Sequence, residues 1–379
     1  MGVKQLIADT TVRTLSSKWV FYVFGMLWIF NIWGSIWYLA AGPDDATFIS
    51  IAFGFKYFGD LGLKYFSHFQ ELFIYLPAYP FAQALFYWLW DTIGLPINLF
   101  TYKVFNLLVL TLLMITSLRL ISVIVPQTKS SQIFRFNIFM VVLAVSPFII
   151  DSLYARPEPL GLLFTVCSLL LFDAAQRNVG WSWFLFSGAA LLLGVAAVTH
   201  PTFIVTSGGL SFMAIIYLLQ RKVYGSLAAS TIAILLPLIA AASWFFAHQP
   251  ESLEMLGRHV SGRSYILDGV GRGLRQMLEY MLLSDPSQSS LKVRLYYGLC
   301  FWTQFLTVLA LMYLAVRGKF WYRIITTNNS FAMVQCFFAF AFLNVVFDAS
   351  ARIQIYTVFA FASILALVIL LPFRDNRSP

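Results

Sequence analysis

Five short polar clusters lie between apolar runs of the sequence, and the first is "GPDDATF". Asp44 and Asp45 follow there directly on a long apolar run. A carboxylate at the water–lipid boundary can stay ionised while it faces a cavity of low dielectric, which is the position that a general base needs. The same pair also fits the first turn of a short amphipathic helix, where aspartate stabilises the helix N-terminus. The residues leave both roles open.

The second cluster is the segment "DSLYARPEPLGLL", which places Asp151, Arg156 and Glu158 in a very short turn between two apolar runs. Charges at membrane depth are costly, so they are usually functional or mutually paired. Pro157 and Pro159 stiffen the turn, which suits the presentation of a side chain into a cavity. Arg156 either pairs with one of the acids or faces a substrate.

The third and fourth clusters carry histidine and arginine. His200 lies in the turn "AVTHPTF", where it is either structural or a group that contacts a phosphate or handles a proton. A later segment, "GRHVSGR", supplies Arg258, His259 and Arg263. Arginine favours bidentate contacts with phosphate, so this segment suits the head of a phosphorylated lipid or the anionic surface of a membrane. The nearby "GVGRG" lacks the frame of a nucleotide-binding loop.

The fifth cluster lies in "NVVFDASARIQIYTVF", where Arg352 and Tyr356 precede and enter the last apolar run. Arg352 could hold a phosphate, or it could pair with Asp348. A cavity with acids for an acceptor and arginines for a phosphate would be a coherent site. The five clusters would form one only if they lie on the same face of the membrane.

The elements that must position these clusters are membrane helices. The chain of 379 residues is 60% hydrophobic and only 11% charged, whereas soluble proteins carry about 25% charged residues. A polytopic membrane protein is therefore predicted. The net charge of +9 does not indicate nucleic acid, because the basic residues sit in short clusters between apolar runs. The three cysteines lie inside apolar runs and show neither metal-ligand spacing nor a disulfide framework.

The predicted fold is all-α, with about ten transmembrane helices in one domain over residues 1–379. A spanning helix needs about 20 apolar residues. We expect spans near 19–41, 98–120, 136–154, 159–176, 182–199, 202–219, 226–247, 294–316, 329–347 and 354–372. The segment 72–95 contains Pro77, Pro80 and Asp91 and is predicted to be a juxtamembrane element. The long outer loops are expected at about 42–97 and 248–293.

The orientation follows from the distribution of Lys and Arg. With the N-terminus inside, the short inner loops hold more than half of the 25 basic residues and few of the 16 acids. An even number of spans returns the C-terminus to the cytoplasm. All five clusters then lie on the outer face. We expect an integral protein, in a bacterial inner (plasma) membrane, whose site faces the periplasm or the outside.

In chain order, these clusters resemble the GT-C superfamily of polytopic glycosyltransferases, which use a polyprenyl-phosphate sugar. Protein O-mannosyltransferases and the aminoarabinose transferases of lipid A are examples. The segments that carry the resemblance are "GPDDATF", "YLPAYPFAQALFYWLWDTIGLPINLFTYKVFNLL", "ARPEPLGLLF", "GVAAVTHPTF", "SWFFAHQPESLEMLGRHVSGR" and "ASARIQIYTVFAF". His200 stands where the superfamily often has lysine. The strict His-x-x-Arg spacing of the superfamily is displaced by one residue in "GRHVSGR".

The resemblance implies a mechanism and a set of roles. A first-loop aspartate, Asp44 with Asp45 second, acts as catalytic base on the acceptor hydroxyl, and Glu158 is a further acid. The acceptor attacks the anomeric carbon with inversion as the lipid phosphate leaves. The residues expected to contact the substrate are Arg156, His200, Arg258, His259, Arg263, Arg352 and Tyr356. No metal site is predicted, although some relatives bind a divalent metal, and Asp44, Asp45 and Glu158 could supply its oxygen ligands.

The expected partners are a lipid-linked sugar donor, membrane lipids and a glycan, lipid or protein acceptor, with no nucleic acid. An alternative function is a transporter or flippase for a lipid-linked or anionic solute. That class would place charges in mid-span and broken helices in repeated halves. The sequence has almost no mid-span charge and no repeat, which favours the transferase. A non-catalytic scaffold would not explain the outer clusters of acids and arginines.

Overall fold

In a computed structural model, the structure describes residues 14–15, 17–23, 25–26, 43–58, 77–125, 129–149, 156–248, 271–283, 291–317, 329–347 and 353–371. Every regular element in these ranges is a helix, so the predicted all-α class is confirmed for them. Most of the predicted first span, 19–41, lies outside the described residues.

Nine of the described helices are apolar enough to belong to a membrane domain. Five of them are also long enough to cross a membrane: α5 (Leu99–Ile124), α8 (Glu158–Arg177), α10 (Thr202–Gln220), α11 (Tyr224–His248) and α14 (Leu291–Arg317). In the other four, the stretch whose side chains are described is shorter: α6 (Lys129–Ala144), α9 (Ser182–Ala197), α16 (Asn329–Phe347) and α17 (Ile353–Leu370). An integral membrane protein is thus supported, while the number of spans and their orientation stay predictions.

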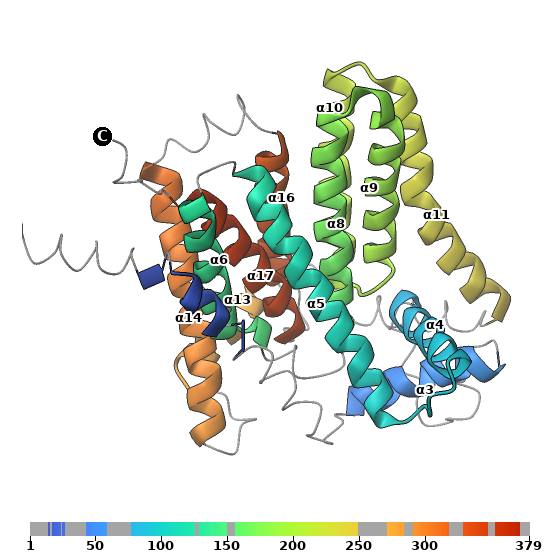
Figure 1. Cartoon of the computed structure of the whole chain (residues 1–379), viewed down its shortest axis with the longest axis horizontal. Helices are drawn as coiled ribbons and strands as arrows, with labels where there is room; N and C mark the ends of the chain where they lie inside the picture. The colour runs from blue at the N-terminus through green and yellow to red at the C-terminus, as the bar shows by residue number, and fades with distance from the viewer. Residues whose placement is uncertain are drawn as a thin grey trace, which may run out of the picture.

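These helices form two groups that meet along α10 and α16 (Figure 1). In the first group, α8, α9, α10 and α11 run side by side as a bundle, and the short 3-10 helix η3 (Val179–Trp181) joins α8 to α9. The second group contains α6, α14, α16 and α17, and α5 lies along α8 between the groups. Seven helices, α8 to α11, α14, α16 and α17, begin and end within about three residues of the predicted spans.

Two helices of the predicted first outer loop, α3 (Pro43–Phe58) and α4 (Ala78–Thr92), lie at one end of the α8–α11 bundle (Figure 1). The backbone N–H of Ala78 donates to the carbonyl of Val198 at the end of α9, with an N–O distance of 3.1 Å. The ring of Phe55 in α3 lies 5.3 Å from the ring of Trp244 near the end of α11. Helix α4 therefore contacts the described end of α9, and α3 packs against the described end of α11.

Helix α4 has two different faces. Tyr79, Gln83 and Tyr87 follow one another at helical spacing and are buried. The opposite face exposes large apolar side chains: Phe81, Leu85, Trp88 and Leu89. With 15 residues the helix is about 22 Å long, which is shorter than the hydrocarbon core of about 30 Å. Its length and pattern agree with the predicted juxtamembrane element.

Helix α6 corrects one predicted boundary. The expected span was 136–154, but the helix begins at Lys129 and ends at Ala144. Arg135, expected to precede the helix, lies inside it and is 2% exposed. Its guanidinium donates to the carbonyls of Val368, Ile369 and Leu371 at the end of α17. Helix ends leave such carbonyls without partners and carry a partial negative charge, so a buried arginine is stable there.

Helix α13 (Arg272–Met281) lies within the predicted second outer loop and was not predicted. Gly271 has a φ of 82°, and its N–H donates to the carbonyl of Val346 at 3.1 Å. A Cβ on Gly273 would lie 2.0 Å from the carbonyl oxygen of Val345, so only glycine permits this approach. Tyr356 of α17 donates its hydroxyl to the carbonyl of Gly273. Gly271 and Gly273 of "GVGRG" thus dock α13 onto the end of α16 and the start of α17.

Candidate functional site

Two of the sequence-predicted site residues meet at the end of the α8–α11 bundle. Glu158 is the first residue of α8, and His200 directly precedes the turn into α10. The Nε2 atom of His200 lies 3.6 Å from Oε1 of Glu158. The Glu158 side chain is fully buried, and the His200 side chain is 15% exposed. A carboxylate and an imidazole therefore share a nearly dry position where the bundle ends.

The next residues of the chain fix the orientation of the His200 ring. Nδ1 lies 2.9 Å from Oγ1 of Thr202, and the backbone N–H of Thr202 donates to the same nitrogen at 3.4 Å. A ring nitrogen that accepts from an N–H carries no proton itself, so this network assigns the proton of the neutral ring to Nε2. The Nε2–H then points toward the carboxylate of Glu158.

The first turn of α10 is held from two sides. The side-chain amide of Asn344 in α16 donates to the carbonyl of Thr202 at 2.7 Å and to Oγ1 of Thr206 at 3.0 Å. On the other side, a Cβ added to Gly161 of α8 would lie 2.3 Å from the ring of Phe203. The missing side chain lets α8 and α10 approach closely beside the Glu158–His200 pair. Three helices thus position the pair.

A buried polar group of α4 and α5 lies beside the same turn. The bond from Ala78 to Val198 brings the start of α4 to the turn that ends in the histidine. In the next residues, the Tyr79 hydroxyl donates to Oδ1 of Asn106 at 2.8 Å, and the Gln83 amide donates to the Tyr79 oxygen at 3.1 Å. Among the described residues, the amide oxygen of Gln83 has no hydrogen-bond partner. The amide oxygen of Gln83 is therefore a buried hydrogen-bond acceptor that is available at this end of the bundle.

The arrangement suits a polyhydroxylated substrate. Hydrogen bonds to a carboxylate are strong, and a surrounding of low dielectric strengthens them further. Glu158 can therefore accept hydrogen bonds from hydroxyl groups, and His200 can exchange a proton with it. In the described part of the chain, no three His, Cys, Asp or Glu side chains group as metal ligands. A metal shared with Asp44 and Asp45 stays a prediction, because the side chains of those two lie outside the described set.

The other predicted residues are placed less completely. Helix α3 begins at Pro43, so Asp44 and Asp45 lie in its first turn, where the helix dipole favours carboxylates. The segment "PDDATF" therefore starts a helix, one of its two predicted roles, while the base role is untested. Arg156 directly precedes the turn into α8 and is partly buried. Outside the described residues lie Asp151, Arg258, His259, Arg263, Asp348 and Arg352.

Tyr356 lies in the same half of the molecule as α13 and is 1% exposed. Its hydroxyl donates to the carbonyl of Gly273, and its ring packs edge-on against Phe301 with centroids 5.0 Å apart. The hydroxyl is thereby engaged in docking α13. A contact between Tyr356 and substrate stays a prediction.

Sequence reasoning missed the residues that hold the pair in place. Thr202 follows His200 by two positions, a spacing at which threonine often bonds to a neighbouring group of the turn. Asn344 is an amide within an apolar run, which is a signal for a hydrogen bond between membrane helices. Gly161 gave no signal of its own, because its importance depends on the ring that it meets.

The sequence matches no protein-family model and has no significant match among curated proteins. Two solved structures are similar to the chain, both crystal structures of ArnT from Cupriavidus metallidurans. The apo structure has a TM-score of 0.46 and the structure bound to undecaprenyl phosphate one of 0.49. In both cases the identity is 13%, over 93% of this chain and 76% of the other. ArnT is a GT-C aminoarabinose transferase, but at this distance neither its activity nor its ligand transfers to the chain.

Proposed function

We propose that the protein is a glycosyltransferase that moves a sugar from a polyprenyl-phosphate-linked donor to an acceptor on the outer face of the membrane, with inversion. The observation that carries the proposal is the buried Glu158–His200 pair at the end of a bundle of apolar helices. The pair belongs to segments that resemble GT-C motifs in chain order. The apolar helices favour a membrane location, where a polyprenyl lipid is dissolved.

On the acceptor side, the reaction needs a base. The acceptor hydroxyl gives its proton to a carboxylate of the first loop, Asp44 with Asp45 as the second choice. Its oxygen then forms a bond to the anomeric carbon of the sugar. The bond from that carbon to the phosphate oxygen breaks, and the electron pair leaves with polyprenyl phosphate. Glu158, whose Oε1 lies 3.6 Å from Nε2 of His200, accepts hydrogen bonds from hydroxyl groups of the bound substrate.

On the donor side, the leaving phosphate gains negative charge as the bond breaks. Fixed cations placed where this charge develops stabilise the transition state. The groups proposed for this role are Arg156, Arg258, Arg263 and Arg352, with His259 and Tyr356 as further contacts. If a divalent cation takes part, Asp44, Asp45 and Glu158 are its proposed oxygen ligands. The proton transfer and the bond cleavage do not require it.

The test uses the purified protein in vesicles that contain polyprenyl-phosphate sugars. Asp44→Asn and Asp45→Asn, each made singly, remove the proposed base and its neighbour. Loss of a general base lowers a rate by about 100-fold or more, so one of the two variants should lose transfer to this extent. Glu279→Gln is the matched control, because it removes an acid of α13 that is about half exposed and paired with Arg275.

Each result bears on a different part of the proposal. Full activity of both Asp44→Asn and Asp45→Asn would remove the pair from catalysis. If the wild-type protein moves polyprenyl-phosphate sugar across the membrane without consuming it, the protein is a transporter instead.

A further inference from the structure

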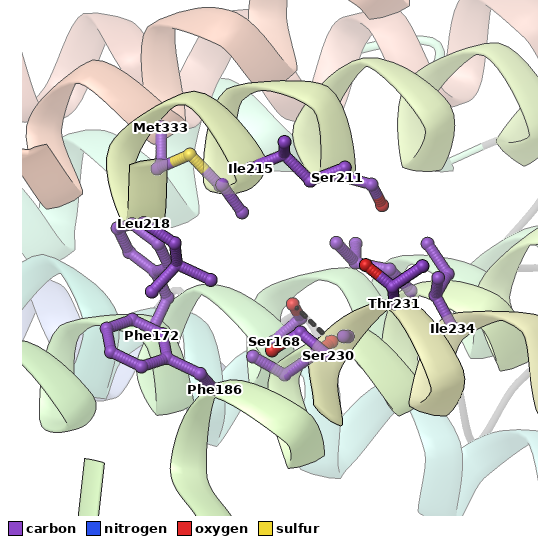
Figure 2. Close-up of a pocket in the computed structure, with 14 residues that line it drawn as sticks. Ser168, Phe172, Phe186, Ser211, Ile215, Leu218, Ser230, Thr231, Ile234 and Met333 are labelled. Carbon is purple, nitrogen blue, oxygen red and sulfur yellow. Dashed lines mark hydrogen bonds between the residues drawn. The ribbon is translucent and has the colours of Figure 1, made fainter. Parts of the chain in front are cut away.

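A cavity lies inside the α8–α11 bundle, away from the Glu158–His200 pair. It is a narrow hollow, and the space between its walls, open surroundings included, amounts to about 490 Å³. Met333, Ile215 and Ser211 lie on one side of it, and Phe172, Phe186 and Ser230 on the other (Figure 2). Ser168 lines the cavity ten residues after Glu158 on α8, which is about 15 Å along the helix axis. The lining is mostly apolar, so the cavity suits a hydrocarbon chain.

One polar group in this lining has no hydrogen-bond partner in the described part of the chain. Ser168, Ser211 and Thr231 each donate their hydroxyl to a helix carbonyl, at 2.8, 2.6 and 2.9 Å. Ser230 is 9% exposed, and its hydroxyl has no hydrogen-bond partner among the described residues. Buried hydroxyl groups are normally satisfied, because an unmade hydrogen bond is costly. A ligand that brings an acceptor to Ser230 would satisfy it.

Helices α10 and α11 both line the cavity, and a chain from the bilayer would enter between them. These two helices contact each other far less than α9 contacts α11 or α8. Their outer faces expose large apolar side chains, Phe212 on α10 and Ile232 and Leu236 on α11. Thr231, which lines the cavity, is also exposed. A hydrocarbon chain can therefore enter from the lipid without crossing water.

The turn between α10 and α11 carries two cations. Arg221 and Lys222 join α10 to α11, and both are exposed. Within the described chain, no carboxylate forms an ion pair with either. Ser230 lies six residues beyond Tyr224, the first residue of α11, and so is about 9 Å from the turn. The interfacial layer of a bilayer is about 5–7 Å thick, and long basic side chains reach along such a distance.

We propose that this cavity binds one acyl chain of an anionic glycerophospholipid. The acyl chain lies in the apolar interior, and the ester carbonyl accepts a hydrogen bond from the hydroxyl of Ser230. The phosphate lies at Arg221 and Lys222. Ser230 sits at the depth where the ester groups of a lipid meet the hydrocarbon, if the basic turn lies at the level of the phosphates. The site differs in place and in ligand from the proposed transfer site, so it stands or falls independently of that function.

The experiment measures lipid retention by native mass spectrometry of the purified full-length protein after exchange into defined lipids. Diacyl phosphatidylglycerol should be retained about tenfold more than diacyl phosphatidylcholine, because the choline cation of the latter offsets the phosphate charge that attracts Arg221 and Lys222. Ser230→Ala should weaken the retention of diacyl phosphatidylglycerol about fivefold. It should leave the dialkyl ether analogue unchanged, since that lipid has no ester carbonyl. Ser211→Ala is the matched control, because its hydroxyl already bonds to a helix carbonyl, and should change neither.

Two further variants probe the other parts of the site. Arg221→Gln with Lys222→Gln should bring the retention of phosphatidylglycerol down to that of phosphatidylcholine. Ala214→Trp should exclude both lipids by filling the cavity, and its melting temperature shows whether it remains folded.

The proposal would be overturned by equal retention of phosphatidylglycerol and phosphatidylcholine, or by equal effects of Ser230→Ala and Ser211→Ala. Displacement of phosphatidylglycerol by an equal concentration of polyprenyl phosphate would also overturn the proposal, because the cavity would then bind a prenyl chain. The two serine variants each remove a single oxygen, so they keep the proposal testable even if Ala214→Trp does not fold.

Discussion

Replacing Gly161 by alanine should loosen the junction that positions the Glu158–His200 pair. The new Cβ would lie 2.3 Å from the nearest ring carbon of Phe203, whereas ordinary contact begins at 3.4 Å. The ring is fully buried and cannot turn into open space. Helix α8 or the ring must therefore move by about 1 Å. Overpacking of this kind costs about 1–3 kcal/mol, so the free energy of unfolding should fall by that amount.

The assay is reversible unfolding in mixed micelles of rising SDS content, followed by circular dichroism. Gly208→Ala is the matched control, because it lies on α10 and no atom would approach its Cβ within 4 Å. Alanine is favoured over glycine in a helix by about 1 kcal/mol, so this control should be unchanged or more stable. Phe203→Leu provides more space, and combined with Gly161→Ala it should recover part of the loss.

Equal stability of Gly161→Ala and Gly208→Ala would refute the close approach of α8 and α10 at this point. A loss that Phe203→Leu does not reduce would also count against it. In that case, the cost of the alanine would arise elsewhere than at the contact with this ring.

Three further predictions concern other contacts. Arg135→Met should lower the free energy of unfolding by about 2–4 kcal/mol, because the carbonyls at the end of α17 lose their donors, and unchanged unfolding in the same assay would contradict this. Tyr356→Phe should cost about 1 kcal/mol through the lost bond to Gly273, measured against the exposed Tyr313→Phe. Nitrogen-15 NMR of histidine-labelled protein, assigned with His200→Gln among the four histidines, should show a neutral His200 as the Nε2–H tautomer, and an Nδ1–H form would rule out the proposed orientation.

The helix ranges could be predicted from the sequence because the length of an apolar run is a local property. Helix α16, for example, occupies the predicted residues 329–347. The prediction was wrong at α6, where a charged residue was taken as a boundary. Arg135 lies inside the helix because its partners are carbonyls of α17, which are distant in the sequence. Composition alone carries no information about such partners.

The candidate site was predictable in its residues but not in its geometry. Glu158 and His200 were both selected as polar residues at the ends of apolar runs, yet nothing in the sequence paired them. Their meeting depends on the close approach of α8 and α10 at Gly161 and on the bond from Asn344. Helix α13 was missed because it is short and polar. The glycines that dock it are typical of a loop when only the sequence is considered.

The measurement that tests the central claim most directly is the release of polyprenyl phosphate from a polyprenyl-phosphate sugar by the purified protein in vesicles. Wild type is compared with Glu158→Gln, which keeps the shape of the side chain and removes its charge, and with Glu279→Gln as control. If the end of the α8–α11 bundle is the transfer site, wild type and Glu279→Gln release the lipid phosphate at equal rates, and Glu158→Gln is slower by about 100-fold or more. Equal rates for all three, or no release by wild type with any such donor, would contradict the account.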